Sequence, residues 1–236
     1  MYWVLPDNRW RYLGSTTMWH ETAQLHLAPD VAAEAVEAQL RHCIQRLPGL
    51  VFFNLGRNLP GSWGSGEMTL DLCFTSAAHQ GSTEAGLAQL PGVVRVDRVA
   101  YQRVGGGQRA VGLQGGIWRT LMFRVRAGCT PEQVQALERD LLRMPDYMPG
   151  IRNWQLGKVC AGSGWTHVWQ QEFAHVEDLQ GEYLTHPFHW GWVDRWFDPE
   201  FPEWSVDALS HAFCPQAASL LTRPLSHRAS DSKELS

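Results

Sequence analysis

The chain has 236 residues, of which 44% are hydrophobic and 19% are charged. These values are those of an ordinary globular protein, and the length allows one large domain or two small ones. The formal net charge of -4 argues against nucleic acid as a partner, because binding to phosphates needs a basic surface. No run of about 18 apolar residues occurs, so we expect neither a transmembrane helix nor a membrane partner.

The first half of the chain alternates strand and helix patterns. A strand is expected over 18–27, and apolar residues at helical spacing then predict an amphipathic helix over 30–47. The stretch LPGLVFFNLGRN, residues 47–58, follows this helix. The remaining predicted elements are a strand over 69–74, a weaker helix over 83–90 and a strand over 93–104.

The second half repeats this order. A strand is expected over 117–126, followed by a helix over 130–144 that begins with Thr130 as N-cap, Pro131 at its first position and Gln133 closing a capping box. The stretch MPGIRNWQLGKV, residues 148–159, then repeats the Pro-Gly and Leu-Gly pairs of the first half. The remaining predicted elements are a strand over 166–173, a weaker helix over 176–185 and a strand over 208–213.

Each half therefore reads strand–helix–strand–strand–helix–strand, the order of a ferredoxin-like (split βαβ) unit. Helices cover one face of such a sheet, and the other face needs a partner. A second copy in the same chain supplies it, so we predict an α+β protein whose two tandem repeats close into a barrel. This pseudo-dimer leaves homodimerisation open. The predicted divisions are a first repeat over 1–104, a Gly-rich linker over 105–116, a second repeat over 117–215 and a disordered tail over 216–236.

The cysteines and the N-terminus predict a cytoplasmic protein. The N-terminal stretch MYWVLPDNRWRYLG lacks an uninterrupted apolar core behind a basic start, so it is a poor signal peptide. The cysteines form an odd set without CxxC spacing, which favours reduced thiols over a disulfide framework. They are Cys43, Cys73, Cys129, Cys160 and Cys214.

Candidate chemistry gathers in the segment from 164 to 192. Tyr183 and His186 fall on one helical face, and Pro187 is expected to end that helix, which leaves His189 on the following turn. His167 lies on the preceding strand and could face the same space. Three imidazoles and a phenol near one concavity predict a proton-transfer site, because histidine titrates near neutral pH. The alternative is that these histidines are hydrogen-bonded structural groups, and that the nearby tryptophans pack rather than bind.

The segment Tyr183-Leu-Thr-His186-Pro-Phe-His189, preceded by Glu-Asp-Leu at 177–179, resembles the stress-responsive A/B barrel (Dabb) family of the dimeric α+β barrel superfamily. The resemblance covers nearly all of 117–215. The first half shares the architecture but not the ending, since Leu90-Pro91 stands where His-Pro is expected. It resembles a degenerate copy that completes the barrel.

This resemblance implies roles for particular residues. In a polyketide-cyclase branch of the family, the positions of Tyr183 and His189 perform acid/base chemistry, and His167 matches a further cavity histidine. A first-strand histidine of the family is replaced by Arg119, which suits a carboxylate or enolate oxygen. The supporting aspartate on the last strand is missing, with His211, Ala212 and Phe213 nearby. The candidate catalytic residues are His189, Tyr183 and His167, and the candidate substrate-binding residues are Arg119, His186, Trp165, Trp190 and His20.

Three functions remain in competition at this point. The favoured one is a small-molecule enzyme of lyase, cyclase or isomerase type, acting without a cofactor on an aromatic or hydrophobic carboxylic or polyketide-like substrate. The second is a ligand-binding or stress-response module without catalysis. The third is a metal or haem site, in which His186 and His189 join Glu182 or His167 as ligands.

Overall fold

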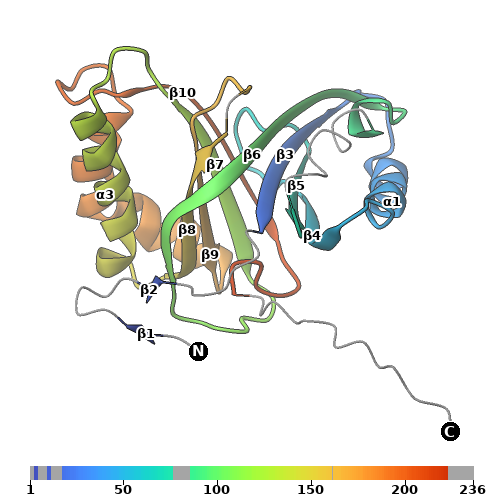
Figure 1. The fold of residues 1–236 in the computed structure, drawn as a ribbon, viewed down its shortest axis with the longest axis horizontal. Coiled ribbons are helices and arrows are strands. Elements are labelled where there is room, and N and C mark those ends of the chain that lie inside the picture. The colour runs from blue at the N-terminus through green and yellow to red at the C-terminus, as the bar shows by residue number, and fades with distance from the viewer. Residues whose placement is uncertain (1–2, 5–9, 12–17, 77–85, 161, 223–236) are drawn as a thin grey trace, which may run out of the picture.

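The structure is a computed structural model, and it describes residues 3–4, 10–11, 18–76, 86–160 and 162–222. Eight strands form one antiparallel sheet between two groups of helices, with α1 on one side and α3 on the other (Figure 1). A separate short hairpin pairs β1 (Trp3–Val4) with β2 (Trp10–Arg11). Within the described residues, no helix is long and apolar enough to span a membrane.

The first repeat has its strands in the order β6-β3-β5-β4. This is the order of a ferredoxin-like unit, in which the first strand lies between the third and the last. Of the helix predicted over 83–90, only 86–90 lies in the described residues, and 86–88 are helical. The elements are β3 (Trp19–Leu27), α1 (Ala33–Ile44), β4 (Leu50–Arg57), β5 (Met68–Phe74) and β6 (Val93–Gln108).

The second repeat has the matching order β10-β7-β9-β8. The two repeats therefore have one topology, and the predicted tandem ferredoxin-like fold is confirmed. The elements are β7 (Ile117–Val125), α3 (Pro131–Tyr147), β8 (Ile151–Val159), β9 (His167–Phe173), α4 (Val176–Asp178), η2 (Leu179–Tyr183), η3 (His189–Val193), η4 (Asp194–Trp196) and β10 (Val206–Pro215).

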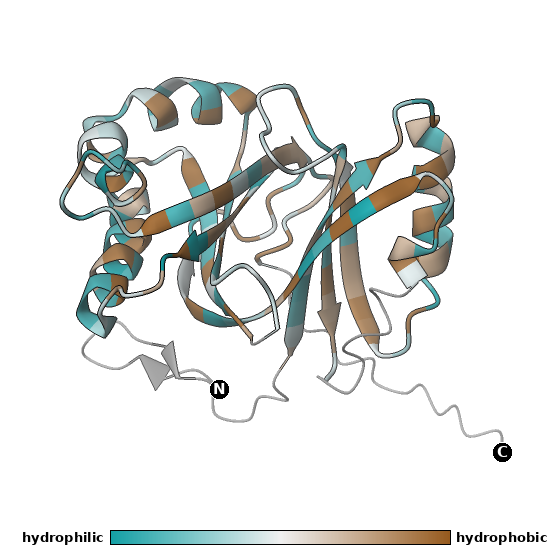
Figure 2. Ribbon diagram, turned by 90° about the horizontal axis from the view of Figure 1, so that it is seen from above, coloured by the Kyte–Doolittle hydropathy of each residue, from teal (hydrophilic) through white to brown (hydrophobic). Residues whose placement is uncertain are grey.

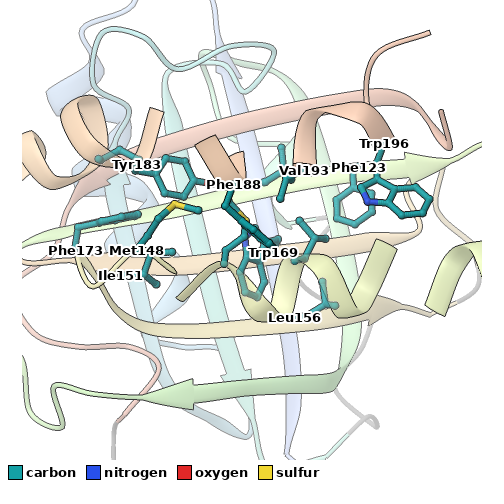
Figure 3. Packing of buried hydrophobic residues seen from close by; sticks show 14 of the residues in the cluster. Phe123, Met148, Ile151, Leu156, Trp169, Phe173, Tyr183, Phe188, Val193 and Trp196 are labelled. Carbon is teal, nitrogen blue, oxygen red and sulfur yellow. The ribbon is translucent and has the colours of Figure 1, made fainter. Parts of the chain in front are cut away.

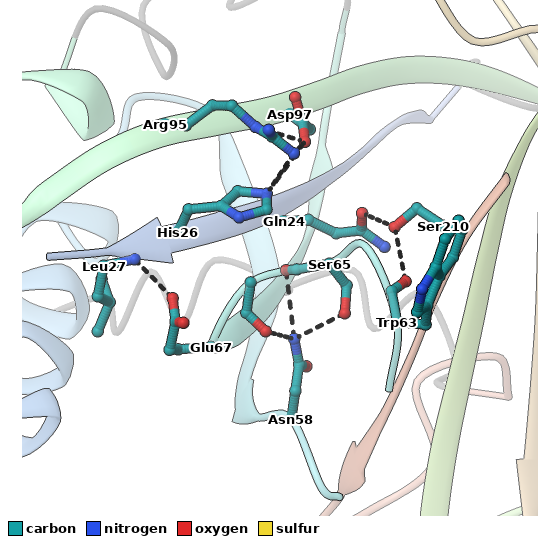
Figure 4. Close-up of polar contacts among 11 residues, drawn as sticks. Gln24, His26, Leu27, Asn58, Trp63, Ser65, Glu67, Arg95, Asp97 and Ser210 are labelled. Atoms are coloured by element: carbon teal, nitrogen blue, oxygen red, sulfur yellow. Dashed lines mark hydrogen bonds and ion pairs between the residues drawn. The ribbon is translucent and has the colours of Figure 1, made fainter. Parts of the chain in front are cut away.

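Two junctions close the strands into a barrel. At the first, β6 pairs with β8, from Tyr101 opposite Val159 to Gln108 opposite Asn153. At the second, β10 meets the loop after β4, where the backbone N–H of Trp63 donates to the carbonyl of His211 at 2.8 Å. Figure 4 shows the side-chain contact that reinforces this second junction: the hydroxyl of Ser210 donates to Gln24 of β3.

Both repeats bury their cores between the strands and their own helices, and hydrophobic residues alternate with polar ones along the strands (Figure 2). In the second repeat, Tyr183, Phe188 and Val193 of the helical segments point towards Trp169 and Phe173 of β9 (Figure 3). This alternation follows from the two-residue period of a strand, which turns one face to the helices and the other to the barrel interior.

The predicted start of α3 is confirmed. The Thr130 hydroxyl accepts from the Gln133 N–H at 3.3 Å, and the Gln133 side chain accepts from the Thr130 N–H at 2.8 Å. Pro131 occupies the first helical position, where its missing N–H has no intrahelical partner to lose. This capping box satisfies two backbone donors and sets the direction in which α3 crosses the sheet.

The repeated Leu-Gly pairs have a packing reason. A Cβ atom on Gly157 would collide with the Tyr101 ring, and a Cβ on Gly56 would collide with the Cys214 side chain. Both glycines therefore let a neighbouring side chain approach the strand backbone inside the barrel. The repeat in the sequence marks two equivalent close approaches, one in each half.

Two predicted boundaries differ from the structure. Strand β6 continues through Gln108 and so includes the first four residues of the expected linker over 105–116. Residues 216–222, expected to be disordered, are packed against the barrel, because the buried Glu172 carboxylate accepts from the N–H groups of Leu220 at 2.6 Å and Leu221 at 3.1 Å. The rest of the predicted tail, 223–236, lies outside the described residues.

Candidate functional site

A cavity of about 350 Å³ lies in the second repeat, between the strands β7, β9 and β10 and the helices that cover them. Its size falls within the range of small-molecule sites, roughly 300–1,000 Å³. Most of the side chains in its wall are apolar. The lining residues used below are Arg119, Trp169, Tyr183, His189, Asp194 and His211.

The helical cover of this cavity departs from the predicted shape. Residues 179–183 and 189–193 form π-helical turns, which carry one more residue per turn than expected and which often occur at functional sites. Pro187 does not leave His189 on a free turn. A second helical segment begins at Pro187, because proline is favoured in the first turn of a helix. His189 therefore lies in the first turn of this second segment, with its N–H donating to the carbonyl of His186 at 2.9 Å.

The structure brings three of the predicted site residues together at the cavity. The rings of Tyr183 and His189 lie 4.7 Å apart at an angle of 42°. The Arg119 guanidinium carbon lies 5.2 Å from the centre of the Tyr183 ring. Arg119 also donates to the side-chain oxygen of Gln171 at 2.9 Å. A cation, a phenol and an imidazole thus share one largely apolar space.

Burial controls the protonation states in this group. Burial first, and the charge of Arg119 second, lower the pKa of His189 to about 4, so the imidazole is neutral at neutral pH. Burial raises the pKa of the Tyr183 phenol, against the opposing effect of Arg119, so the phenol keeps its proton. The site therefore presents a neutral imidazole, able to accept a proton, beside a phenol able to donate a hydrogen bond.

Two further polar residues, Asp194 and His211, line the cavity, although the sequence did not predict either as a site residue. The Asp194 carboxylate lies 3.9 Å from the Nε2 atom of His189, and burial raises its pKa. His211 has its pKa lowered to about 4 by burial and by Arg119. A signal for His211 was present, because Leu209, His211 and Phe213 alternate along the last strand and so share one face.

The structure places His167 and His186 away from the cavity wall. His167 stacks on Phe123 at 4.9 Å, and its Nε2 atom lies 3.1 Å from a carboxylate oxygen of Glu138 on α3. The Nδ1 atom of His186 accepts from the N–H of Phe188 at 3.1 Å, so this residue caps the second helical segment. Both histidines thus have structural partners that account for their positions.

Three other predicted binding residues also lie elsewhere. Trp165 packs against the interior cluster at one end of the barrel, and Trp190 is 59% exposed on the outer surface. His20 stacks on Tyr101 at 5.7 Å on the barrel-facing side of β3, with its pKa lowered to about 4 by burial and Arg103. Alignment of Trp19 with Trp118 in the sequence makes His20 equivalent to Arg119. In the structure, however, the side chains of His20 and Arg119 lie on opposite faces of the sheet.

The described residues contain no group of three or more His, Cys, Asp or Glu side chains arranged to hold a metal ion. The two histidines considered as metal ligands, His186 and His189, have different surroundings. His186 uses Nδ1 to cap a helix, whereas His189 packs on Tyr183 inside the cavity.

The fold and the cavity define a two-repeat α+β barrel with a largely apolar pocket beneath the helices of its second repeat. Residues 117–206 match the family described as the stress responsive A/B barrel (Dabb) domain. The match begins at the first residue of β7 and ends at the first residue of β10, so it covers most of the second repeat. A search of curated proteins found no match to this sequence.

Solved structures show the same fold over nearly the whole chain. An anthrone oxidase-like protein aligns with a TM-score of 0.61 and 8% identity, covering 90% of this chain and 98% of that one. The chlorite dismutase of Candidatus Nitrospira defluvii, in complex with imidazole, aligns with a TM-score of 0.53 and 8% identity, covering 87% of this chain and 92% of that one. At such low identity these likenesses show the fold alone.

Proposed function

We propose that the cavity is the active site of an enzyme that moves a proton at a carbon atom next to a carbonyl group. The reaction is of lyase, cyclase or isomerase type, and the substrate is an aromatic or hydrophobic carboxylic or polyketide-like compound. The observation that carries the proposal is the neutral His189, packed 4.7 Å from Tyr183 in a cavity that also contains Arg119. Two proteins of this fold carry enzyme names, which supports the proposal only by analogy.

Each of the three residues has a role in the proposed step. His189 takes the proton from the carbon atom and later returns it to the product. The oxygen of the carbonyl becomes an enolate, and the O–H of Tyr183 donates a hydrogen bond to it. Arg119 holds an anionic group of the substrate, as a guanidinium binds oxygen anions well. The proton and the electron pair are both accounted for, so this step needs no oxidant.

The low pKa of His189 would make it a weak base in the empty cavity. Part of that lowering comes from the charge of Arg119. An anionic group bound to Arg119 offsets this charge and so raises the pKa of His189. The substrate would thereby strengthen the base that acts on it.

Proton exchange with deuterated water tests this step directly. Aromatic keto acids such as phenylpyruvate should lose the proton next to the carbonyl in the presence of the protein, as followed by NMR. We expect the exchange rate to fall by roughly 100-fold or more in His189→Gln and by a smaller factor in Tyr183→Phe. His42→Gln, on the exposed surface of α1, is the matched control and should exchange normally. Undiminished exchange in His189→Gln would refute the assignment.

A non-catalytic ligand-binding module is the second candidate. The observation in its favour is the 3.9 Å between His189 and Asp194, which is too long for a hydrogen bond that would orient the imidazole. Such a module gains thermal stability with a ligand but leaves it unchanged. Stabilisation without exchange for every acid tested would favour this candidate.

A further inference from the structure

Strand pairing allows the two repeats to be compared position by position. Each repeat ends its third strand at a phenylalanine, Phe74 or Phe173, which pairs with the first residue of the first strand, Trp19 or Ile117. The first strands are equally long, with nine residues each. These pairs therefore align the first strands of the two repeats, β3 and β7, residue by residue.

Two positions further along, Glu21 of β3 is equivalent to Arg119 of β7. By the same register, Arg98 of β6 is equivalent to His211 of β10. All four side chains face the helical layer of their own repeat, and within each repeat the two positions are diagonal neighbours on adjacent strands. Side chains at such positions are close enough to interact directly or through a shared ligand.

The first repeat fills these positions with a buried ion pair. Arg98 donates to the two carboxylate oxygens of Glu21, once at 2.9 Å through Nε and again through its terminal nitrogen. The side chains of Glu21 and Arg98 are 0% and 9% exposed. Their charges compensate each other in a place that water hardly reaches, as buried charges must.

The second repeat has positive or neutral groups at both positions. Arg119 is 9% exposed, and its hydrogen-bond partner is the uncharged Gln171. Among the described residues, Arg119 forms no ion pair, and the ring nitrogens of His211 have no hydrogen-bond partner. The Glu21 carboxylate, which pairs with Arg98 in the first repeat, has no counterpart at the equivalent position of the second repeat.

A buried donor in the cavity wall is also without an acceptor. The indole N–H of Trp169 has no partner in the described part of the chain, and this residue is 0% exposed. Leaving a buried donor unmatched costs about 1–3 kcal/mol. The site thus has a surplus of donors, and the carboxylate that lines it, Asp194, forms no ion pair with Arg119 in the described part of the chain.

We propose that this cavity binds a hydrophobic monocarboxylate whose carboxylate lies between Arg119 and His211, in the role that the Glu21 carboxylate has in the first repeat. The apolar part of the ligand packs on the apolar wall, against side chains such as Leu141 and Met144 of α3. This inference names the substrate class of the proposed active site, but it concerns binding and requires no turnover.

A carboxylate in this position brings a proton with it. The charged or titratable groups that line the cavity with His211 are Arg119, Tyr183, His189 and Asp194, and α3 contributes only apolar side chains to the wall. Arg119 opposes protonation of His211 in the empty cavity. A ligand carboxylate neutralises that charge and pairs with the imidazolium form, so binding is coupled to proton uptake on His211.

Calorimetric titration with octanoate and phenylbutyrate tests this inference, with octanamide and phenylbutyramide as neutral partners of the same shape. We expect each acid to bind at least about tenfold more tightly than its amide. In two buffers of different ionisation enthalpy, the heats should reveal proton uptake near neutral pH. His211→Gln should abolish the uptake and weaken the acids, and Arg119→Gln should remove the preference for acid over amide. The control His42→Gln should behave as wild type.

The outcomes also separate this inference from the proposed enzyme. His189→Gln should still prefer acid to amide, although the proposed reaction needs His189. Keto acids such as phenylpyruvate that bind with proton uptake but never exchange would support the anion site and refute the enzyme. Equal binding of acid and amide, undiminished uptake in His211→Gln or no binding of either acid would overturn the inference. If Arg119→Gln fails to fold, the uptake measured in His211→Gln still decides the question.

Discussion

Arg119 is the residue through which the polar groups of the cavity affect one another. Its charge lowers the pKa of His189, His211 and Asp194, and it opposes the rise that burial causes in the pKa of Tyr183. Such influence is possible because the cavity is largely apolar, and charges interact more strongly where water does not screen them. A change in the charge of this one side chain should therefore alter the protonation of the whole site.

Replacement of Arg119 provides the corresponding prediction. In Arg119→Gln the pKa values of His189 and His211, both about 4 in the wild type, should rise, because the nearby positive charge is gone while burial remains. Titration of the imidazole signals by NMR measures the shift. Arg124→Gln removes an exposed charge from the same strand and should leave both values unchanged. Identical titration in the two variants would contradict a direct effect of Arg119.

Individual residues also show how well the sequence motif predicts which side chains line the cavity. Tyr183, His189 and Arg119 were predicted as site residues and do line the cavity. His167 was predicted as well, and it does face the helices. However, it lies two positions from Trp169, roughly 7 Å along the strand, and there it meets Glu138 instead of the cavity. Spacing in the sequence indicates the face of a strand, but not which part of the helical layer covers each position.

At the scale of elements, the helical cover decides where His189 and Asp194 lie. The second helical segment is tied to α3 through one carboxylate: Asp140 accepts from the Trp196 indole at 2.9 Å and from Arg195 at 3.1 Å. Asp140 is only 7% exposed, so water can hardly replace it as an acceptor. Asp140 thus helps to hold the segment that carries the proposed base, together with Tyr147 of α3, whose ring stacks on Phe188 at 4.1 Å.

We expect Asp140→Ala to lower the free energy of unfolding by about 1–3 kcal/mol, because buried donors of Trp196 and Arg195 lose their acceptor. Asp140→Asn keeps one acceptor oxygen and should cost less. Urea unfolding measures both, and Asp146→Ala, on the exposed face of the same helix, should have little effect. A loss in Asp146→Ala as large as that in Asp140→Ala would refute the proposed anchor.

At the scale of the whole molecule, a polar network inside the barrel joins the two repeats. Asp71 of β5 accepts from Thr22 at 2.7 Å, from Gln170 of the second repeat at 3.0 Å and from Tyr101 at 3.3 Å. Burial raises the pKa of Asp71 to about 6, although these hydrogen bonds oppose the rise. The carboxyl group therefore holds its proton more tightly in the folded protein than in the unfolded chain.

This difference predicts a pH dependence of stability. Because the folded pKa is the higher one, Asp71 favours folding most at acidic pH, and this contribution disappears as the pH rises from about 4 to about 6. Relative to Asp71→Asn, the wild type should lose up to roughly 3 kcal/mol across that interval. Urea unfolding at several pH values measures this difference, with the exposed Asp30→Asn as control. A difference that does not vary with pH would show that folding leaves the pKa of Asp71 unchanged.

The sequence by itself determined the two repeats, their strand and helix order and the start of α3. These depend on local signals: hydrophobic period, Pro and Gly positions and a capping box within one turn. It also predicted Tyr183 and His189, which lie together at the cavity, because their motif lies within one continuous segment. Only the tertiary structure decided that His211 joins them and that the first repeat matches Arg119 with Glu21. Those relations depend on the pairing of strands far apart in the chain, where a shift of one residue turns every side chain to the opposite face.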